Sequence, residues 1–496
     1  MDSLFNLLNG FQVAISLQNL YLCFIGCLMG SIVGVLPGVG PIVGLTLLIP
    51  ATYGLDITGA LIMLAGIYYG AMYGGSTTSI LMNIPGESAS VVTCLDGYAM
   101  TLKGRAGAAL FIAAWGSWIG GTLATIGIMF LAPSLADFAM KFGPAEMFTL
   151  LLVAFILLGT LGTSSFIKSM VMVLFGLLVG TIGMDLLAGI PRFTHGIYEL
   201  YDGVGFAAVA IGVFGIGEIL SSTGESLVKK IYKPKFRELF PNREELRASW
   251  GPIFRGSGLG FAVGLLPGAG HILSSFLSYM IEKRLAKKPE EFGTGRIEGV
   301  AGPESANNAA VGGAMVPFLA LGIPTTLGTA VMISVLLTHG VRPGPLLLSE
   351  QPQIFWGLIA SMYIGNIILV ILNLPMVGLF VTFLRIPFAI LFPIILLLCL
   401  IGTYSINNSS VELAILLVSG VLGYVLRKLK YDLAPFVLAL VIGPFIEMSF
   451  RQSLMRSGGS FSIFFEKPIC LTFLSIAAAL LCWNIFRSLR PAARKN

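Results

Sequence analysis

The sequence predicts an all-α polytopic membrane protein made of two inverted repeats with re-entrant helical hairpins. Of its 496 residues, 56% are hydrophobic and only 11% are charged, which leaves too few charged side chains to cover a water-soluble surface. Long apolar stretches recur from one end of the chain to the other, and a helix that spans a bilayer needs about 20 such residues. A short motif containing Leu-Pro-Gly also occurs twice.

The apolar stretches predict about 12 to 14 membrane segments. They run over residues 19–36, 42–54, 59–82, 108–131, 146–161, 166–190, 204–220, 253–280, 309–337, 353–384, 386–402, 411–426, 433–448 and 469–487. We therefore expect a first transmembrane repeat over 1–220, a basic connector over 221–251 and a second repeat over 252–448. Residues 449–496 would add a final membrane helix and a basic tail.

The connector is the longest polar stretch. Its basic residues predict a cytoplasmic location by the positive-inside rule, and they are Lys229, Lys230, Lys233, Lys235, Arg237, Arg243 and Arg247. Asn242 and Glu245 have the spacing of a capping box, which favours a helix that begins there. Since Leu246, Trp250 and Phe254 follow, we expect a short interfacial helix.

Two ordered motif pairs indicate a duplication. Gly34–Gly40 returns as Gly264–Gly270, 230 positions later (264 − 34), and Asn83–Gly86 returns as Gly322–Thr325, 239 positions later (322 − 83). Chance similarity between glycine- and proline-rich apolar segments is the alternative, but two matches in the same order favour an internal repeat. Many secondary transporters are built from such repeats.

Charge patterning predicts how the two hairpins are oriented. No Lys or Arg precedes Lys103, whereas basic residues flank the second Leu-Pro-Gly motif on both sides. If both flanks are cytoplasmic, Ile253–Ile281 must return to its starting side as two helical arms of about 13 residues each. The first hairpin would then open toward the outside, so the repeats would be inverted. The tips supply the candidate binding residues Gly38, Gly40, Gly268 and Gly270.

The first polar cluster follows the first hairpin, over Tyr73–Ser79. Four consecutive hydroxyl residues after two glycines favour an unwound segment whose polar groups replace water around an ion or a substrate. The alternative is helix packing through small residues, with the hydroxyls bonded back to their own helix. The candidate ligands are Ser76, Thr77, Thr78, Asn83, Pro85 and Gly86.

The second polar cluster contains two adjacent amides, Asn307 and Asn308, beside an apolar stretch. Buried amides are costly unless their polar atoms are satisfied, so this pair is the strongest candidate for substrate or ion binding. The alternative is that the pair caps a helix. The turn that follows adds Gly322, Pro324, Thr325 and Thr326 as candidate ligands.

Among titratable residues, Glu87 and Glu304 are candidates for gating or coupling, although carboxylates near helix starts are also ordinary. His271 directly follows the second tip, where Pro41 follows the first. Weaker candidates, each more ordinary than functional, border apolar stretches or lie in loops, and they are Glu146, Asp185, Glu218, Glu447, His195 and His339. The six cysteines lack paired spacing or neighbouring histidines, so neither a metal site nor a disulfide framework is expected.

The sequence contains no HExxH, no GxSxG, no P-loop and no aspartate-rich diphosphate motif. We therefore expect neither an enzyme nor a nucleotide-driven pump, and no cofactor. Transport would then use an ion gradient, of sodium or of protons. The net charge of +6 comes mainly from loops between apolar segments, so no nucleic-acid partner is expected.

Several of these motifs, taken in order, resemble the large membrane subunit of the tripartite tricarboxylate transporter family. The resemblance covers about residues 20–445 and rests on Gly34–Gly40, Tyr73–Ser79, Asn83–Glu87, Asp96–Tyr98, Lys103–Leu110, Pro303–Asn308 and Gly322–Pro324. One departure is that Thr325 and Thr326 stand where the family pattern has Gly-Ser, which leaves the polar lining of that turn open.

The resemblance implies a permease of a bacterial or archaeal inner membrane that takes up a tricarboxylate or a related organic acid. It also implies two partners, a small membrane subunit and a soluble extracytoplasmic solute-binding protein, and coupling to sodium or protons. The competing functions are a passive channel and a membrane-embedded enzyme or scaffold subunit without flux.

Overall fold

The computed structural model describes residues 2–36, 40–161, 165–185, 187–222, 238–268, 270–383 and 388–489. Nearly all regular structure in this part of the chain is helical. The two strands, β1 (Gly183–Met184) and β2 (Pro191–Arg192), are two residues each and pair antiparallel in a loop. The predicted all-α class is confirmed.

Up to Ser222 the chain forms a first series of helices. They are α1 (Asp2–Ala14), α2 (Leu17–Val35), α3 (Gly40–Thr52), α4 (Ile57–Met82), η1 (Ser88–Ser90), α5 (Val91–Thr93), η2 (Cys94–Tyr98), α6 (Ala99–Leu102), α7 (Ala106–Ala139), α8 (Pro144–Leu161), α9 (Phe166–Gly180), η3 (Tyr198–Leu200), α10 (Phe206–Ala210), η4 (Ile211–Ile216) and α11 (Gly217–Ser222).

From Arg243 onward a second series begins. It comprises α12 (Arg243–Gly264), α13 (Gly270–Leu285), η6 (Pro289–Glu291), α14 (Glu298–Leu321), α15 (Leu327–Thr338), α16 (Leu346–Glu350), α17 (Pro352–Asn373), α18 (Val377–Phe383), α19 (Phe388–Asn407), α20 (Ser410–Lys428), α21 (Ala434–Arg456), α22 (Ile463–Glu466) and α23 (Pro468–Leu489).

Seven helices in the described ranges are long and apolar enough to cross a membrane, which fits a multi-pass membrane protein. They are α2, α4, α7, α17, α20, α21 and α23. Shorter apolar helices, among them α3, α8, α9 and α15, accompany them.

Two rows of glycines, which we call the glycine ladders, confirm the internal repeat. They are Gly26, Gly30 and Gly34 in the first repeat and Gly256, Gly260 and Gly264 in the second. In each repeat, a hairpin arm packs tightly on the long central helix, α2 on α4 and α12 on α14. A methyl group added at Gly30 would lie 2.3 Å from the Ile67 carbonyl oxygen, and one added at Gly260 would lie 2.2 Å from the Ala306 carbonyl oxygen. Such distances exclude any side chain, so glycine is required at both positions.

The ladders reproduce both offsets found in the sequence. On α2, Gly26, Gly30 and Gly34 face the carbonyl groups of Met63, Ile67 and Ala71; on α12, Gly256, Gly260 and Gly264 face those of Gly302, Ala306 and Ala310. The glycines are 230 positions apart between repeats (260 − 30), and their partners are 239 apart (306 − 67). The two repeats therefore match in how their helices pack as well as in their sequence motifs.

Each central helix also ends in an equivalent break. Asn83 caps α4 in the left-handed conformation at φ 56°, and Gly322 caps α14 at φ 68°. A new helix follows each break, η1 after Glu87 and α15 after Thr326, and each of these two residues forms a capping box with the residue three positions on. The motifs that contain Pro85 and Pro324 thus mark where the central helices stop.

Three expectations differ from the structure. Tyr73–Ser79 is not unwound, because α4 continues to Met82 and the break comes only afterwards. The capping box at Asn242 is present, but the helix that it starts is not a separate short one, since it runs on to Gly264 as the first hairpin arm. Apolar stretches predicted as continuous are broken, 309–337 between α14 and α15, 353–384 between α17 and α18, and 166–190 where α9 ends at Gly180.

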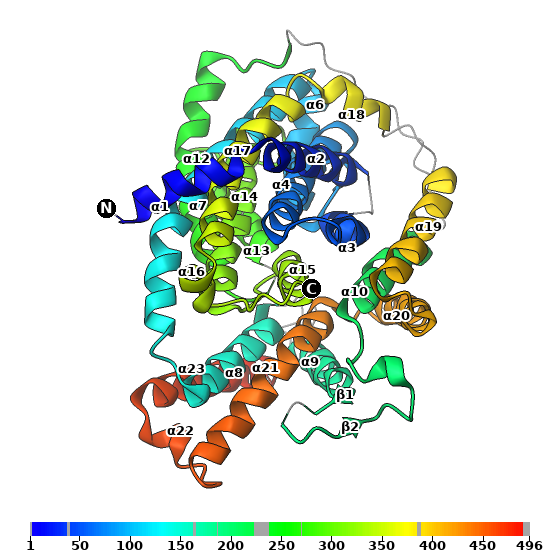
Figure 1. The fold of residues 1–496 in the computed structure, drawn as a ribbon. Helices are drawn as coiled ribbons and strands as arrows, with labels where there is room; N and C mark the ends of the chain where they lie inside the picture. Colours follow the sequence, from blue (N-terminus) through cyan, green and yellow to red (C-terminus); the bar gives the residue numbers. More distant parts are fainter. Residues whose placement is uncertain are drawn as a thin grey trace.

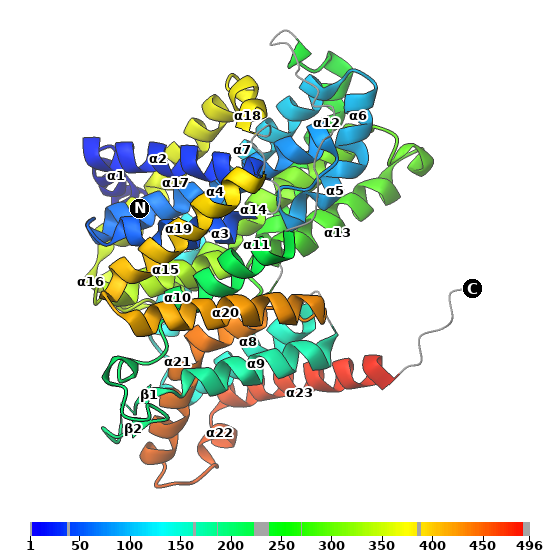
Figure 2. The ribbon, with the colours of Figure 1, turned by 90° about the vertical axis from the view of Figure 1, so that its right-hand side faces the viewer.

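The hairpin arms and central helices of the two repeats pack together with α7 and α17, while the later helices of each repeat form a second group beside them (Figures 1 and 2). Within the repeats, α7 packs on α14 while α17 packs on α4, so each central helix contacts a helix from the other half of the chain. In the second group, α8, α9, α21 and α23 pack against one another, and α20 packs on η4. The space between these two groups positions the site.

Candidate functional site

A cavity of about 390 Å³ lies where the hairpins and helix breaks of the two repeats meet the second group of helices. Its volume is in the range of small-molecule sites in proteins. Gly40 and Pro41 line it from the first hairpin, and Gly268 and His271 line it from the second. The structure therefore brings together the two tips that the sequence analysis had selected separately.

The helix breaks line the same cavity. Pro85, Gly86 and Glu87 contribute from the first break, and Leu327 and Gly328 contribute from the second. Four of the described α-helices begin at the cavity, namely α3, α13, α15 and α21. Because the first N–H groups of a helix are unpaired and carry partial positive charge, their convergence favours an anionic ligand.

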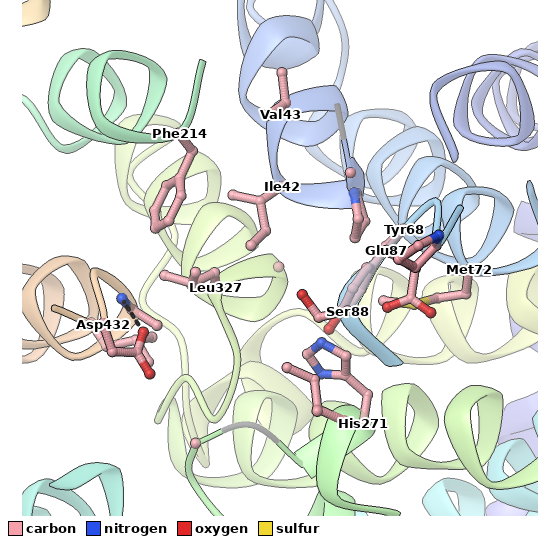
Figure 3. Close-up of a pocket in the computed structure, with 18 of the residues that line it drawn as sticks. Ile42, Val43, Tyr68, Met72, Glu87, Ser88, Phe214, His271, Leu327 and Asp432 are labelled. Atoms are coloured by element: carbon pink, nitrogen blue, oxygen red, sulfur yellow. Dashed lines mark hydrogen bonds between the residues drawn. The ribbon is translucent and has the colours of Figure 1, made fainter. Parts of the chain in front are cut away.

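The opposite wall of the cavity comes from the second group of helices. The residues of this wall were not selected as candidates from the sequence. Figure 3 shows Phe214 and Asp432 on this side, facing the Ser88 and His271 side chains across the cavity. Arg427 is the one Lys or Arg among the described lining residues, and a guanidinium matches carboxylate geometry well. In the sequence it lies in a basic cluster next to Lys428, which reads as an ordinary topological anchor.

Glu87 connects the cavity to the centre of the second repeat. It is 6% exposed, and its side chain accepts hydrogen bonds from the Ala89 main chain at 2.6 Å and from Asn307 Nδ2 at 3.0 Å. The equivalent residues in the other repeat make the equivalent bond, since Tyr68 donates to Thr326 at 3.1 Å. Each central helix thus bonds the break of the other repeat, an exchange that indicates an approximate two-fold relation.

Glu304 lies deeper, in the interior of α14. It is 1% exposed and accepts hydrogen bonds from the hydroxyls of Ser76 and Thr93. One turn further along α14, Asn308 donates to Ser117 at 2.7 Å. This polar network joins residues from α4, α5, α7 and α14, which the sequence separates by many positions.

Asn307 and Asn308 do not cap a helix, because α14 begins at Glu298 and both amides lie well inside it. Both side chains are at most 1% exposed, and each has an Oδ1 atom without a hydrogen-bond partner. Two buried amide oxygens without donors are unusual in a folded protein. The polar network therefore has unused acceptor capacity.

Only some of the residues predicted to bind a substrate or an ion line the cavity. Those that line it are Gly40, Pro85, Gly86, Glu87, Gly268 and His271. Those that do not line it are Ser76, Thr77, Thr78, Asn83, Gly270, Glu304, Asn307, Asn308, Gly322, Pro324, Thr325 and Thr326. Gly38 lies outside the described residues.

Several residues of this second set have visible structural contacts. Thr78 donates to the Val35 carbonyl at 2.8 Å, which fastens α4 to α2. The Gly268 main chain donates to the Thr325 carbonyl at 2.9 Å, which fastens the second tip to the second break. Thr78 and Thr325 thus hold the frame around the cavity.

The weaker acidic candidates lie away from the cavity, mostly in ion pairs. Glu146 pairs with Lys467, and Glu447 pairs with Arg192. The Ala188 main-chain N–H and the Arg451 guanidinium hold the pKa of Asp185 below its ordinary value. The side chain of Glu218 is outside the described part of the structure.

The two remaining histidines have no part in the cavity lining. His195 is exposed in the β1–β2 region, and His339 stacks on Tyr53 at the end of α15.

Comparison with known proteins adds a family and two relatives. The model of the family described as "Tripartite tricarboxylate transporter TctA family" matches residues 20–438 of this chain. The "Uncharacterized 52.8 kDa protein in TAR-I ttuC' 3'region" of Agrobacterium vitis is 44% identical over 495 residues, covering 100% of this chain and 99% of the relative. An "Uncharacterized protein in TAR-II ttuC' 3'region" of the same organism is 46% identical over 231 residues, covering 47% of this chain and 96% of the relative. No solved structure matches this chain.

Proposed function

This chain belongs to the tripartite tricarboxylate transporter TctA family, and we propose that it is the permease subunit that moves an organic carboxylate across the membrane. The substrate is a tricarboxylate or a related acid, and the energy comes from a sodium or proton gradient. The protein acts as a transporter and not as an enzyme.

The observation that carries this proposal is the cavity between the two hairpin tips. Four helix N-termini and the Arg427 side chain surround it, and both are groups that stabilise a carboxylate. The same walls contain Ile42, Phe214 and Leu438, which suit the carbon skeleton of a small acid. Discontinuous helices that meet between repeats are a common way to build a transporter site.

We further propose that the chain works with partners. A small membrane subunit would cover part of its apolar surface, and an extracytoplasmic solute-binding protein would deliver the acid. Family membership supports a tripartite assembly in a bacterial inner membrane. Since the binding protein meets the substrate first, it would set much of the substrate selectivity.

Uptake by proteoliposomes tests this function. Vesicles would contain the chain with its small subunit and binding protein, and labelled citrate and a panel of dicarboxylates would be supplied with and without sodium and proton gradients. We expect accumulation that requires the binding protein and one of the gradients. Arg427→Gln should lower the uptake rate, while Lys428→Gln, on the next residue, should leave it unchanged because Lys428 does not line the cavity.

The two competing functions give different results. A passive channel would equilibrate the acid regardless of the gradients. A scaffold or enzyme subunit would show no flux with any carboxylate of the panel, although all three components were folded. Either result would contradict the proposed function.

A further inference from the structure

A second, much smaller cavity lies inside the repeats, between α4, α7 and α17. Its volume is about 10 Å³, which is close to the space that one water molecule or one bare ion occupies. Its polar lining residues are Tyr73, Ser76, Thr77, Ser117 and Asn373. Among the residues that the structure describes, it shares no lining residue with the larger cavity.

Two of these hydroxyl groups present only lone pairs to the small cavity. Ser76 is within hydrogen-bond distance of the Met72 carbonyl and of the Glu304 carboxyl, so its single hydrogen points to one of them. Ser117 donates to the Glu304 carbonyl at 3.4 Å and accepts from Asn308. Neither hydroxyl has a hydrogen left for a molecule in the cavity.

The amide of Asn373 presents an oxygen as well. Its Nδ2 atom donates to the Leu369 carbonyl at 2.9 Å and to Ser31 at 3.2 Å, while its Oδ1 atom has no partner. Asn373 is 4% exposed, and Tyr73, whose hydroxyl also has no partner, is 3% exposed. Both side chains are therefore buried, each has one polar atom without a partner, and both belong to the same lining.

This arrangement suits a cation better than a water molecule. Ser76, Ser117 and Asn373 each offer an acceptor atom, and a water molecule can donate only two hydrogen bonds. A cation is attracted by every lone pair at once. The donors are all hard oxygen atoms, which favour an alkali or alkaline-earth ion over a transition metal.

The charge of the surroundings selects a monovalent ion. Glu304 bonds Ser76 directly, and it takes part in none of the ion pairs in the described segments. A buried carboxylate without a positive partner is unstable, so a positive charge near Ser76 would stabilise it. A single carboxyl group is too little charge for a calcium or magnesium site, which uses several.

The second repeat lacks part of this oxygen lining. The positions equivalent to Tyr73, Ser76 and Thr77, 239 residues later, are Gly312, Met315 and Val316. These residues offer no side-chain oxygen. The oxygen lining at Tyr73, Ser76 and Thr77 thus lies at a place where the two repeats differ.

We propose that this cavity binds one sodium ion, with Ser76, Thr77, Ser117, Asn373 and Tyr73 as its oxygen ligands and Glu304 as the compensating charge. The inference rests on the proposed function in that the bound ion would be the coupling ion. The proposed sodium ion lies away from the carboxylate substrate in the larger cavity. Asn307, one turn from Glu304 on α14, connects the two places because it donates a hydrogen bond to Glu87, which lines the larger cavity.

Thermal unfolding of the purified chain tests the site without substrate, partners or transport. Sodium chloride would be titrated against potassium chloride and choline chloride at constant ionic strength. A ligand that binds only the folded state raises the unfolding temperature, so we expect a rise with sodium alone. Thr77→Val and Tyr73→Phe each remove one oxygen at nearly constant shape, and each should weaken the apparent sodium affinity by about tenfold.

Thr78→Val is the matched control, because Thr78 lies on the same helix but bonds the Val35 carbonyl and does not line the small cavity. It should keep the sodium response of the unmodified protein. Two variants are used at the site so that misfolding of one leaves the test intact.

Two results would overturn the proposal. If the unmodified protein responds equally to all three salts, the cavity holds water and the charge of Glu304 is compensated by a proton. If Thr77→Val and Tyr73→Phe both keep the full sodium response, the ion binds elsewhere. Carboxylate uptake is measured separately, so absent uptake with an intact sodium response would count against the proposed function and not against this site.

Discussion

The two repeats share one backbone frame but carry different side chains within it. The glycine ladders, the helix breaks and the capping boxes occur in both. At equivalent positions, however, Pro41 corresponds to His271, and Ala65 corresponds to Glu304. The shared backbone therefore shapes the cavity, while the side chains that differ between the repeats supply the polar groups that can bind a substrate or an ion.

The exchanged hydrogen bonds illustrate the same division. Tyr68 and Thr326 form a neutral pair, whereas Asn307 and Glu87 form a pair with a carboxyl group. The geometry is equivalent, but only the second pair can carry charge to the cavity wall. Substitutions at equivalent positions can therefore separate the role of the frame from that of the polar groups.

The largest expected effect comes from breaking the frame itself. Gly30→Leu and Gly260→Leu each place a side chain against a carbonyl oxygen of the central helix, since even a methyl group would lie 2.3 Å and 2.2 Å away. Overpacking a close helix contact costs about 1–3 kcal/mol or more. We expect both variants to lose most of the folded protein, measured as the monodisperse fraction after size-exclusion chromatography in detergent.

Gly258→Leu is the control for this pair, because Gly258 lies on the same arm and a side chain there meets open space. It should fold normally. If Gly30→Leu folds while Gly260→Leu does not, the two ladders are not equivalent in energy, and the comparison must be confined to geometry.

A smaller and unequal effect is expected from the exchanged bonds. Asn307→Leu removes the side-chain donor to Glu87, and a buried oxygen left without a hydrogen-bond partner costs about 1–3 kcal/mol. Tyr68→Phe removes the donor to Thr326, which keeps its bond to Thr329, at a cost of about 0.5–1.5 kcal/mol. The initial rate of carboxylate uptake should fall by about a hundredfold in the first variant and by less than about threefold in the second.

Equal losses in these two variants would contradict the proposed difference between the repeats. In that case both bonds would serve only to hold the central helices to the breaks. Unfolding temperatures of both variants, measured alongside uptake, show whether a loss of rate reflects a loss of folded protein.

Much of the fold could be predicted because membrane insertion leaves a strong pattern in the sequence. Apolar stretches of spanning length gave the all-α class, and the motifs around Pro37 and Pro267 gave the repeat and its hairpins. The prediction failed for Tyr73–Ser79, which is helical. Hydroxyl side chains can satisfy themselves by bonding back to the helix, as Ser76 and Ser79 do, so their abundance alone does not indicate unwinding.

The site was predictable only where it lies at a motif. The tips and Glu87 were selected because glycine, proline and acidic residues stand out in apolar surroundings. Arg427 and Asn373 were missed, since a basic residue after a membrane helix and a single amide within one have common explanations. Their significance depends on contacts between distant segments, and no local pattern contains that information.

The tips themselves can be compared by substitution. His271 lines the larger cavity, and its Nδ1 atom has no hydrogen-bond partner, whereas Pro41 offers no side-chain donor. We expect His271→Leu to raise the half-saturating carboxylate concentration by about tenfold, the worth of one hydrogen bond of about 1.4 kcal/mol. Pro41→Ala should change it by less than about twofold. A larger effect at Pro41 would show that the first tip acts through its backbone shape.

The smallest effect is expected at the second break, where Thr325 occupies the position equivalent to Gly86. A methyl group added at Gly86 would lie 2.4 Å from the Gly34 carbonyl oxygen, so the first repeat requires glycine there. The Thr325 hydroxyl is 3.5 Å from the Ala314 carbonyl, at the limit of a hydrogen bond, and the bond from Gly268 goes to its main chain.

Thr325→Ala keeps the main-chain bond, so uptake should stay within about twofold of the unmodified protein and the free energy of unfolding should change by less than about 1 kcal/mol. Gly86→Ala is the contrasting variant and should reduce the folded fraction. If Thr325→Ala instead abolishes uptake without loss of folded protein, the Thr325 hydroxyl contacts the substrate in a conformation other than this one. The second break would then move during transport, and the two repeats would differ in motion as well as in side chains.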